Sequence, residues 1–249
     1  MPVVATEPFH LPHAHCIEGV LRDIPVHARL NWSGDLARVD LGDLGAFRVT
    51  PSAIEIARRC ADNDHWREVL FGPAALMWLA ERSVFALHAS AFAVEEEACA
   101  LLGVSGAGKS TLARHAASHG MRIADDVLPI AIRGDRIVAR TPFPQLKLAD
   151  SEQYHGRSLP LARIALLRRG ESLQVKTAAP GDVGRWILRH TLGSRLYSPN
   201  AMVAHLQMAS LVAAAVERGE LRAQVLTVPH RPEDPAAAAK EAYAALAAS

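Results

Sequence analysis

The sequence predicts an α/β fold with a small β-rich region at its N-terminal end. Residues 1–65 contain short segments in which apolar and polar residues alternate, separated by Gly and Asp. From about residue 85, apolar runs of strand length alternate with helical segments, and one glycine-rich loop joins such a run to a helix. We therefore expect a β-rich region over residues 1–65 and a larger α/β domain over residues 66–249.

Composition narrows the class of protein. The 249 residues are 50% hydrophobic and 21% charged, which is typical of a globular chain. Lys and Arg number 27 against 26 Asp and Glu, so the basic excess of a nucleic-acid binder is missing. No uninterrupted apolar run has the ~18–20 residues that span a bilayer. The N-terminal segment has no basic stretch before an apolar one, so we expect no signal peptide and no membrane partner.

Cysteine usage agrees with a cytoplasmic location. The chain has three widely spaced cysteines, Cys16, Cys60 and Cys99, and no CxxC pair. An odd, scattered set does not form a disulfide framework. We expect all three side chains to be free thiols.

The first elements follow from local patterns. Residues 36–50 alternate apolar and polar, with Gly42 and Gly45 as turns, and predict strands. Residues 51–62 begin with Pro51, a favoured first-turn residue, and predict a short helix. Residues 66–83 have apolar residues at helical spacing, with a start or kink at Gly72-Pro73.

The middle of the chain predicts strands around one helix. An apolar run from residue 84 and a second one ending near residue 103 predict two buried strands joined by an acidic turn. Residues 110–119 predict a helix that ends at Gly120, a typical helix-terminating glycine. Four more apolar segments predict strands, two of them forming a hairpin around residues 133–135: residues 121–125, 127–132, 136–140 and 161–169.

The last third is mostly helical. Ser198-Pro199 is typical of a helix start and precedes a long apolar segment. A strand follows over residues 221–229, and an alanine-rich stretch from Pro235 predicts the final helix.

The glycine-rich loop is the main functional motif. Residues 103–110, GVSGAGKS, fit G-x-x-x-x-G-K-[ST], with an apolar strand before and an amphipathic helix after. Such a loop points successive backbone N–H groups at phosphate oxygens, and the helix N-terminus adds a positive dipole end. A plain strand-to-helix turn would leave Lys109 unexplained. The candidate nucleotide-binding residues are Gly103, Ser105, Gly106, Ala107, Gly108, Lys109, Ser110 and Thr111.

These residues have distinct expected roles. Lys109 would reach the β- and γ-phosphates, and Ser110 would ligate Mg²⁺. The pair Asp125-Asp126 begins 16 residues after Lys109, at the end of an apolar segment. In parallel sheets the carboxyl ends of strands gather around the ligand, so one carboxylate would hold Mg²⁺ and the other would accept a proton. The alternative is an ordinary turn-initiating Asp pair.

Two single residues complete the candidate site. His88 lies in an otherwise apolar run, where a histidine is more often a hydrogen-bonded core residue than a catalytic one. Lys147 lies between two leucines and follows Pro142 and Pro144. An isolated lysine is usually solvated, but these rigid neighbours are compatible with a placed side chain.

The residues over 84–133 together resemble the catalytic domain of HPr kinase/phosphorylase. The resemblance lies in Leu87-His88-Ala-Ser-Ala, the loop that ends in Gly-Lys-Ser-Thr111, and Gly120-Met-Arg-Ile-Ala-Asp-Asp126. That family has a P-loop, a histidine on the preceding strand and a paired Asp after the next strand. Its fold is similar to that of phosphoenolpyruvate carboxykinase, with a P-loop beside a mixed, twisted sheet flanked by helices.

The resemblance implies the cofactors ATP and Mg²⁺ and phosphorylation of a serine hydroxyl. It implies that Asp125 is the acid/base group and Asp126 the carboxylate on the metal side. His88 would lie near the reacting phosphate. Together with Lys109 and Lys147, these residues form the predicted catalytic set.

The chain also departs from the bifunctional enzymes of that family. They carry a downstream segment of the form E-[IL]-R-G-x-G, which residues 142–150, PFPQLKLAD, replace here. We therefore expect little reverse phosphorolysis. The chain resembles shorter stand-alone kinases that phosphorylate lasso-peptide precursors at a C-terminal serine, so the expected partner is a peptide or small protein.

Three other functions stay open at this point. The chain could be a kinase of a small hydroxylated metabolite, or a nucleotide-sensing module that needs Lys109 and Ser110 but not Asp125. It could also be a docking subunit whose N-terminal strands bind a peptide. Assembly into a homo-oligomer is left open as well.

Overall fold

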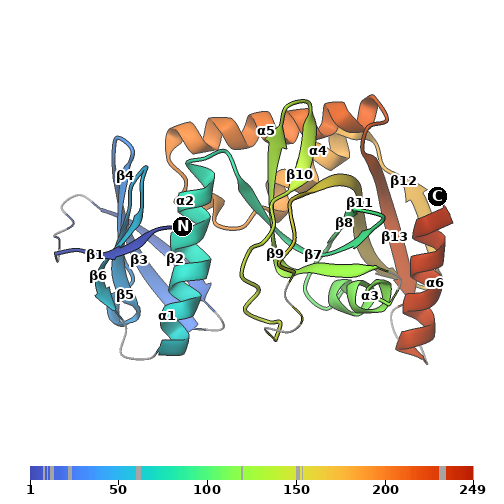
Figure 1. Cartoon of the computed structure of the whole chain (residues 1–249), viewed down its shortest axis with the longest axis horizontal. Helices are drawn as coiled ribbons and strands as arrows, with labels where there is room; N and C mark the ends of the chain where they lie inside the picture. The colour runs from blue at the N-terminus through green and yellow to red at the C-terminus, as the bar shows by residue number, and fades with distance from the viewer. Residues whose placement is uncertain are drawn as a thin grey trace. The chain divides into compact units, whose positions relative to one another are not determined.

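The computed structural model describes residues 1–7, 9, 11, 14–21, 24–59, 63–118, 120–149, 152, 154–229 and 234–248. It is a mixed α/β structure with two sheets (Figure 1). The chain divides into two compact units. The first comprises Met1–Ser83 and Gly193–Ala204, and the second Val84–Leu192 and His205–Ser249. The division thus falls after Ser83 rather than at the predicted residue 65, and a later segment returns to the first unit.

The first unit contains a six-stranded sheet in the order β1-β6-β5-β4-β3-β2. Its pairings are antiparallel except for β1 with β6. The strands are β1 (Val3–Ala5), β2 (His15–Leu21), β3 (Ile24–Ser33), β4 (Leu36–Asp40), β5 (Gly45–Val49) and β6 (Ile54–Arg59). The 3₁₀ turn η1 (Gly42–Leu44) joins β4 to β5, where the sequence predicted a turn.

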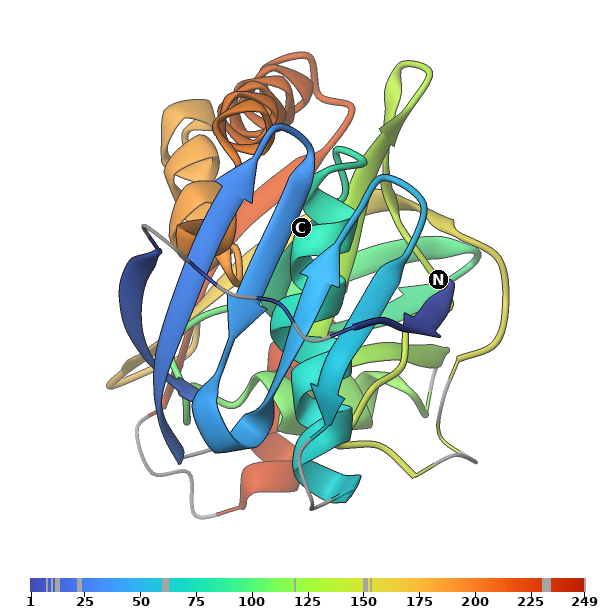
Figure 2. The same ribbon diagram turned by 90° about the vertical axis from the view of Figure 1, so that its left-hand side faces the viewer.

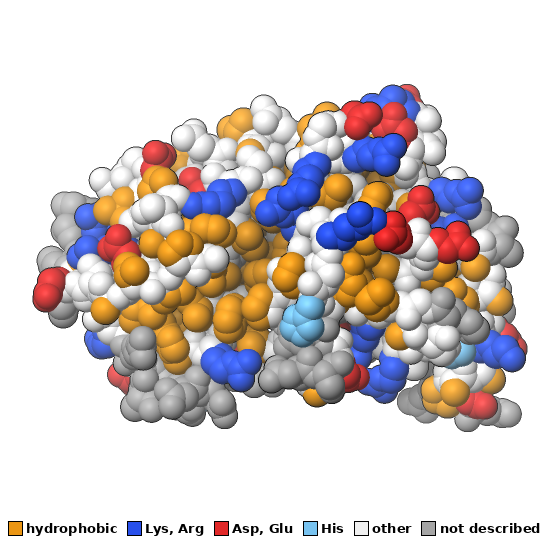
Figure 3. Space-filling model, viewed as in Figure 1, with side chains coloured by type: hydrophobic (Ala, Val, Ile, Leu, Met, Phe, Trp, Pro, Cys, Tyr) orange, Lys and Arg blue, Asp and Glu red, His pale blue; other side chains and the backbone are white. Residues whose placement is uncertain are grey.

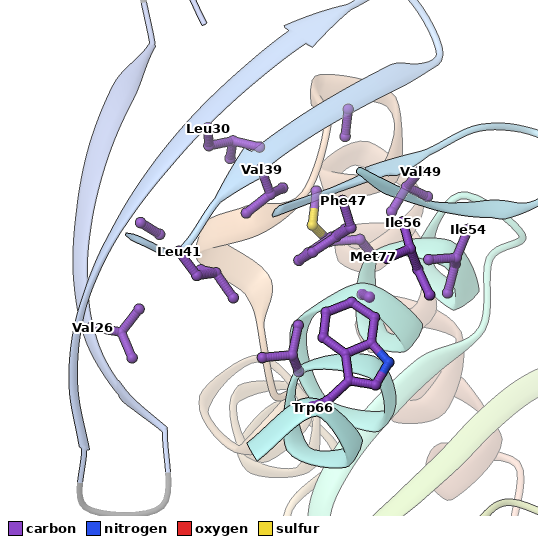
Figure 4. Close-up of a cluster of buried hydrophobic side chains, with 14 residues drawn as sticks. Val26, Leu30, Val39, Leu41, Phe47, Val49, Ile54, Ile56, Trp66 and Met77 are labelled. Carbon is purple, nitrogen blue, oxygen red and sulfur yellow. The ribbon is translucent and has the colours of Figure 1, made fainter. Parts of the chain in front are cut away.

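One helical segment packs against this sheet (Figure 2). It consists of α1 (Asn63–Val69), the π-helical turn η2 (Leu70–Ala74) and α2 (Ala75–Ala80). Gly72 has non-helical angles just before Pro73, so the kink lies where the sequence placed it. Phe47 of the sheet and Met77 of α2 are fully buried in the shared core (Figure 4).

One element of this unit differs from its prediction. Residues 51–62 were expected to form a helix, but Ile54–Arg59 is strand β6. Ile54 and Ile56 are both buried in the core of this unit, whereas Glu55 between them is only half-buried. This spacing of two residues is that of a strand, and burial of both isoleucines outweighs the helix-start preference of Pro51. Residues 60–62 lie outside the described residues.

The second unit contains a seven-stranded mixed sheet in the order β10-β9-β7-β8-β11-β13-β12. Strands β8, β11 and β13 are parallel neighbours, and the other pairings are antiparallel. The strands are β7 (Phe85–Val94), β8 (Glu97–Leu102), β9 (Met121–Arg133), β10 (Arg136–Ala139), β11 (Leu159–Gly170), β12 (Gln174–Thr177) and β13 (Arg222–Pro229). The parallel strands end beside the glycine-rich loop.

Helices cover this sheet. α3 (Lys109–Ala116) and α6 (Pro235–Ala248) share one core with Leu101, Leu167 and Leu226 of the three parallel strands. α4 (Pro180–His190) and α5 (Pro199–Glu217) follow β12, and the short turn η4 (Ser194–Leu196) separates them (Figure 1). α4 contacts β7, and Gly184 of α4 lies so close to α5 that an added Cβ would be 3.3 Å from the Ala209 carbonyl oxygen.

Helix α5 is long and apolar enough to cross a bilayer, judged by length and composition alone. Its mean hydropathy over the tested window is 1.2, and the core helix of a soluble protein passes the same test. His205 of α5 is buried, and its ring lies 5.1 Å from that of Phe85 of β7. The part of α5 from His205 onward therefore packs against the sheet within this unit.

Two details of the middle region correct the sequence analysis. Residues 121–132 form one continuous strand, β9, so Asp125-Asp126 lies within a strand and not at its end. Gly120 does not terminate α3, whose C-cap is Ala117. A Cβ on Gly120 would collide with the backbone of Ala93, so close strand contact explains this glycine.

Candidate functional site

The glycines of residues 103–110 are needed for the path of the backbone. Gly103 has φ 144°, and a Cβ there would lie 2.7 Å from the carbonyl oxygen of Leu167. Gly108 has φ 102° and is the N-cap of α3. Only glycine adopts such angles at low cost, so the loop turns directly from β8 into the helix and exposes its backbone N–H groups.

Lys109 is buried at the first position of α3, with 6% of its surface exposed. Its ammonium donates to the carbonyl oxygens of Gly103, at 2.8 Å, and Val104, at 3.2 Å. Nζ also lies 3.3 Å from Nε2 of His88. Burial lowers the pKa of Lys109, while the nearby Asp126 carboxylate raises it. A buried ammonium of this kind is a strong site for an anionic group.

Asp125 is buried and fully engaged with neighbouring side chains. Its Oδ1 accepts hydrogen bonds from Ser110, at 2.6 Å, and from Ser90, at 2.8 Å. Its Oδ2 lies 2.5 Å from the guanidinium of Arg122, also a buried side chain. The backbone N–H of Asp125 donates to Gln145 Oε1. This carboxylate is thereby fixed next to the P-loop serine.

Asp126 has a different environment. Its Oδ1 lies 3.1 Å from Nδ1 of His88, and its Oδ2 lies 3.0 Å from Nζ of Lys147. Burial raises the pKa of this carboxyl, but hydrogen bonds from His88 and Lys147 outweigh that effect and hold the pKa at about 2. One third of the side chain is exposed, so Asp126 is an ionised group that a substrate can reach.

The two carboxylates reach the same face of the sheet, although consecutive strand residues normally point to opposite faces. Asp125 bonds to Ser90 and Asp126 to His88, which are two residues apart on β7 and share a face. Asp126 has φ 100°, a strained value for a residue with a side chain. Such strain is typical of functional sites.

These groups line one cavity of about 250 Å³. It contains almost all of the predicted site, including His88, Lys147 and both aspartates. Ser105, Gly106, Ala107, Gly108, Lys109, Ser110 and Thr111 line it from the loop and α3. Gly103 lies behind the loop and holds Lys109 through its carbonyl. The structure therefore brings together predicted residues from four separate stretches of the chain.

Sequence reasoning missed the residues that support the site. Ser90 and Arg122 bind Asp125, and Gln145 Nε2 donates to the carbonyls of Val127 and Phe143. Arg169, at the end of β11, donates to the carbonyls of Gly106 and Pro229. Ser90 could have been found, because it follows His88 by two residues on a predicted strand. The others depend on tertiary contacts that no local pattern indicates.

The neighbouring oxygen atoms of Ser110 and Asp125 suit Mg²⁺, which prefers oxygen ligands. In many proteins Mg²⁺ has only one or two protein ligands, and the phosphates of the substrate supply others. Over the described residues, no group of three or more His, Cys, Asp and Glu side chains forms a metal site by itself. The residues present thus fit a magnesium ion shared with a nucleotide better than a metal held by the protein alone.

On the face drawn in Figure 3, Lys and Arg side chains form several separate groups, some of them beside Asp and Glu.

The comparisons with known proteins include a distant likeness to a solved structure. No family model matches the chain, and no curated protein matches it. Among solved structures, the chain is similar to the Hpr(Ser) kinase/phosphatase from Coxiella burnetii, at 9% sequence identity and a TM-score of 0.33. That match covers 62% of this chain and 86% of the other. Because so distant a likeness carries no argument about activity, the functional conclusion rests on the geometry of the site.

Proposed function

We propose that this chain is an ATP- and Mg²⁺-dependent kinase that transfers the γ-phosphoryl group to a serine hydroxyl of a peptide or small protein. The observation that carries this proposal is the single cavity in which the P-loop faces the Asp126–His88–Lys147 group. The P-loop side of the cavity suits the phosphates of the donor, and the opposite side offers the Asp126 carboxylate to the acceptor hydroxyl. Phosphoryl transfer requires mainly these two things, held in line.

The nucleotide would bind along the loop. Its phosphates would lie on the backbone N–H groups and near the Lys109 ammonium. A smaller, mostly apolar cavity of about 70 Å³ shares Ala107, Gly108, Thr111 and Arg169 with the first one. Its residues would hold the nucleoside, and Arg169 lines both cavities.

The geometry favours exchanging the roles that the sequence analysis gave to the two aspartates. Asp125 is bonded to Ser110, the P-loop serine, and paired with buried Arg122, which suits the metal side. Asp126 is more exposed and forms an ion pair with Lys147, which suits the acceptor side. We therefore propose Asp126 as the proton acceptor and Asp125 as the metal-side carboxylate.

In the proposed reaction, the acceptor oxygen forms a bond to the γ-phosphorus while the bond to the β–γ bridging oxygen breaks and ADP leaves. The hydroxyl proton passes to Asp126. The low pKa of Asp126 makes this carboxylate a weak base. A loose transition state needs the proton transfer only late, so the main contribution of Asp126 is to orient the hydroxyl. Lys109 and Lys147 stabilise the charge on the transferring group. A bound Mg²⁺ would neutralise phosphate charge beside Ser110 and Asp125.

The acceptor class follows from the resemblance to the short stand-alone kinases, whose acceptors are precursor peptides with a C-terminal serine. The test uses γ-³²P-labelled ATP with Mg²⁺ and two pools: synthetic peptides that end in serine, and small hydroxylated metabolites. Peptides that end in alanine are the matched control. We expect label only on serine-ended peptides. Label on metabolites alone would replace the peptide acceptor, and ATP binding without any transfer would favour a nucleotide-sensing module.

A further inference from the structure

One edge of β9 changes its neighbour close to the two aspartates. On this edge the pairing with β10 ends at Ile130, and one further bond joins the Arg140 N–H to the Pro129 carbonyl at 2.7 Å. Among the strands that the structure describes, none pairs with this edge of β9 at residues 125–127. A side chain from the segment after β10, that of Gln145, binds the backbone there.

Gln145 makes the contacts that a neighbouring strand would otherwise make. The residue is buried, with 2% of its surface exposed. Its Oε1 accepts a hydrogen bond from the Asp125 N–H at 2.8 Å, and its Nε2 donates to the Val127 carbonyl at 2.8 Å. Buried backbone groups are costly to leave unpaired, so these two bonds hold this stretch of β9. One carboxamide thus binds the backbone on both sides of Asp126.

The backbone between these two bonds is strained. Asp126 has φ 100°, a value that few residues with a side chain adopt. Such a conformation persists only where the surrounding structure imposes it. The same angle brings the Asp126 carboxylate to His88, on the face of the sheet that carries the cavity. By fixing the residues before and after Asp126, Gln145 supplies part of that restraint.

Gln145 also fixes the turn that carries Lys147. Its backbone carbonyl accepts a hydrogen bond from the Leu148 N–H at 3.1 Å, and its Nε2 donates to the Phe143 carbonyl at 3.1 Å. Gln145 and Leu148 are both buried, whereas Lys147 between them is exposed and lies 3.0 Å from Oδ2 of Asp126. Both members of the Asp126–Lys147 ion pair therefore depend on one buried side chain.

We propose that Gln145 is a positioning residue of the acceptor side, which sets the backbone of Asp126 and the turn that presents Lys147. The described residues that line the cavity do not include Gln145, so it acts through these two residues and not on the substrate. This inference rests on the proposed function for its effect on turnover, whereas the geometry of the ion pair can be measured without it.

The test compares crystal structures and kinetics of the full chain. Gln145→Met keeps the length of the side chain but removes the hydrogen bonds of the carboxamide. We expect φ of residue 126 to become negative and the distance between Asp126 Oδ2 and Lys147 Nζ to increase from 3.0 Å. The kcat should fall by about 10–100-fold, the usual result of misplaced groups. The KM for ATP should stay within a few-fold, because the P-loop is unchanged.

Two further variants separate positioning from a general loss of structure. Gln224→Met is the matched control, since Gln224 of β13 is also a buried glutamine and does not line the cavity. It should leave φ of residue 126 and kcat unchanged. The double variant of Gln145→Met with Asp126→Asn should lose much less kcat than the product of the two single losses, because the two residues act as one unit.

The outcomes are distinct. If Gln145→Met leaves the geometry and kcat unchanged, if Gln224→Met has the same effect, or if the losses multiply in the double variant, the proposal is wrong. If Gln145→Met does not fold, Gln145→Asn is measured in the same way, because its amide is too short to bind both Asp125 and Val127. If wild type transfers no phosphate, the kinase proposal fails, but the crystal structures still decide whether Gln145 positions Asp126.

Discussion

The two adjacent aspartates should respond very differently to the same substitution. Asp125→Asn keeps the shape of the side chain but removes its charge. Asp125 and Arg122 have 9% and 8% of their side chains exposed, so the substitution leaves a buried guanidinium without its partner. Breaking one side of a buried pair costs about 3–5 kcal/mol.

Asp126→Asn should cost much less stability. Asp126 is 33% exposed and its partner Lys147 is 54% exposed, and such pairs contribute about 0–1 kcal/mol. The substitution also leaves the backbone angle of residue 126 tolerable, since Asn accepts positive φ about as well as Asp. The expected difference between the two variants is therefore about 2–5 kcal/mol.

Urea unfolding, followed by circular dichroism and by tryptophan fluorescence, measures this difference. Trp186 of α4 reports on the second unit. We expect a much lower midpoint for Asp125→Asn than for Asp126→Asn, with unchanged slopes. Equal midpoints, or a larger loss for Asp126→Asn, would refute the assignment of Asp125 as the buried, structural and metal-side carboxylate.

Four further predictions follow from the same structure. Gly103→Ala should abolish nucleotide binding and destabilise the chain, because its Cβ would meet the Leu167 carbonyl. Gly106→Ala, whose Cβ would have no atom within 4 Å, should lower the free energy of unfolding by only about 1 kcal/mol. Calorimetric titration with ATP and thermal unfolding compare the two variants. Burial lowers the pKa of His190 in the folded chain from 6.5 to about 4. Its contribution to stability is therefore present above pH 6.5 and lost as the pH falls towards 4. The difference in unfolding free energy between wild type and His190→Gln should change only between these two pH values. Exposed Cys16 should react with a thiol reagent in the native chain, while buried Cys99, whose pKa burial raises to about 12, should react only after unfolding; a native Cys–Cys bridge would contradict this. Incubation of phosphorylated acceptor with inorganic phosphate should release little pyrophosphate, since residues 142–150 lack the E-[IL]-R-G-x-G pattern, and rapid release would mean that other residues support the reverse reaction.

The local parts of the fold could be predicted from the sequence. The strand–loop–helix around Lys109, the acidic turn after β7 and the start of α5 at Pro199 all carry strong local signals. The helix predicted for residues 51–62 rests on Pro51, which lies just before β6. The core that buries Ile54 and Ile56 is formed by distant residues, so the strand could not be predicted from its own sequence. Propensity is weak against such burial.

The candidate site was predictable in membership but not in detail. All of its predicted residues except Gly103 line one cavity. Which aspartate faces Ser110 depends on the positive φ of Asp126, and no sequence pattern encodes that angle. The bridge between Thr191 and Leu87 brings the end of α4 beside β7, a pairing over about 100 residues that no local pattern indicates.

The most direct test of the central claim is the rate of phosphoryl transfer from labelled ATP to a serine-ended peptide by wild type, Asp126→Asn and Lys109→Ala. Wild type should transfer label in a Mg²⁺-dependent reaction. Lys109→Ala should lose at least ~10²-fold of the rate, the size of one preorganised electrostatic group. Asp126→Asn should lose ~10²-fold, the lower end of the range for a general base, because this carboxylate mainly orients the hydroxyl, while its ATP affinity stays within a few-fold. Near-normal transfer by both variants would contradict the claim that this cavity carries out phosphoryl transfer.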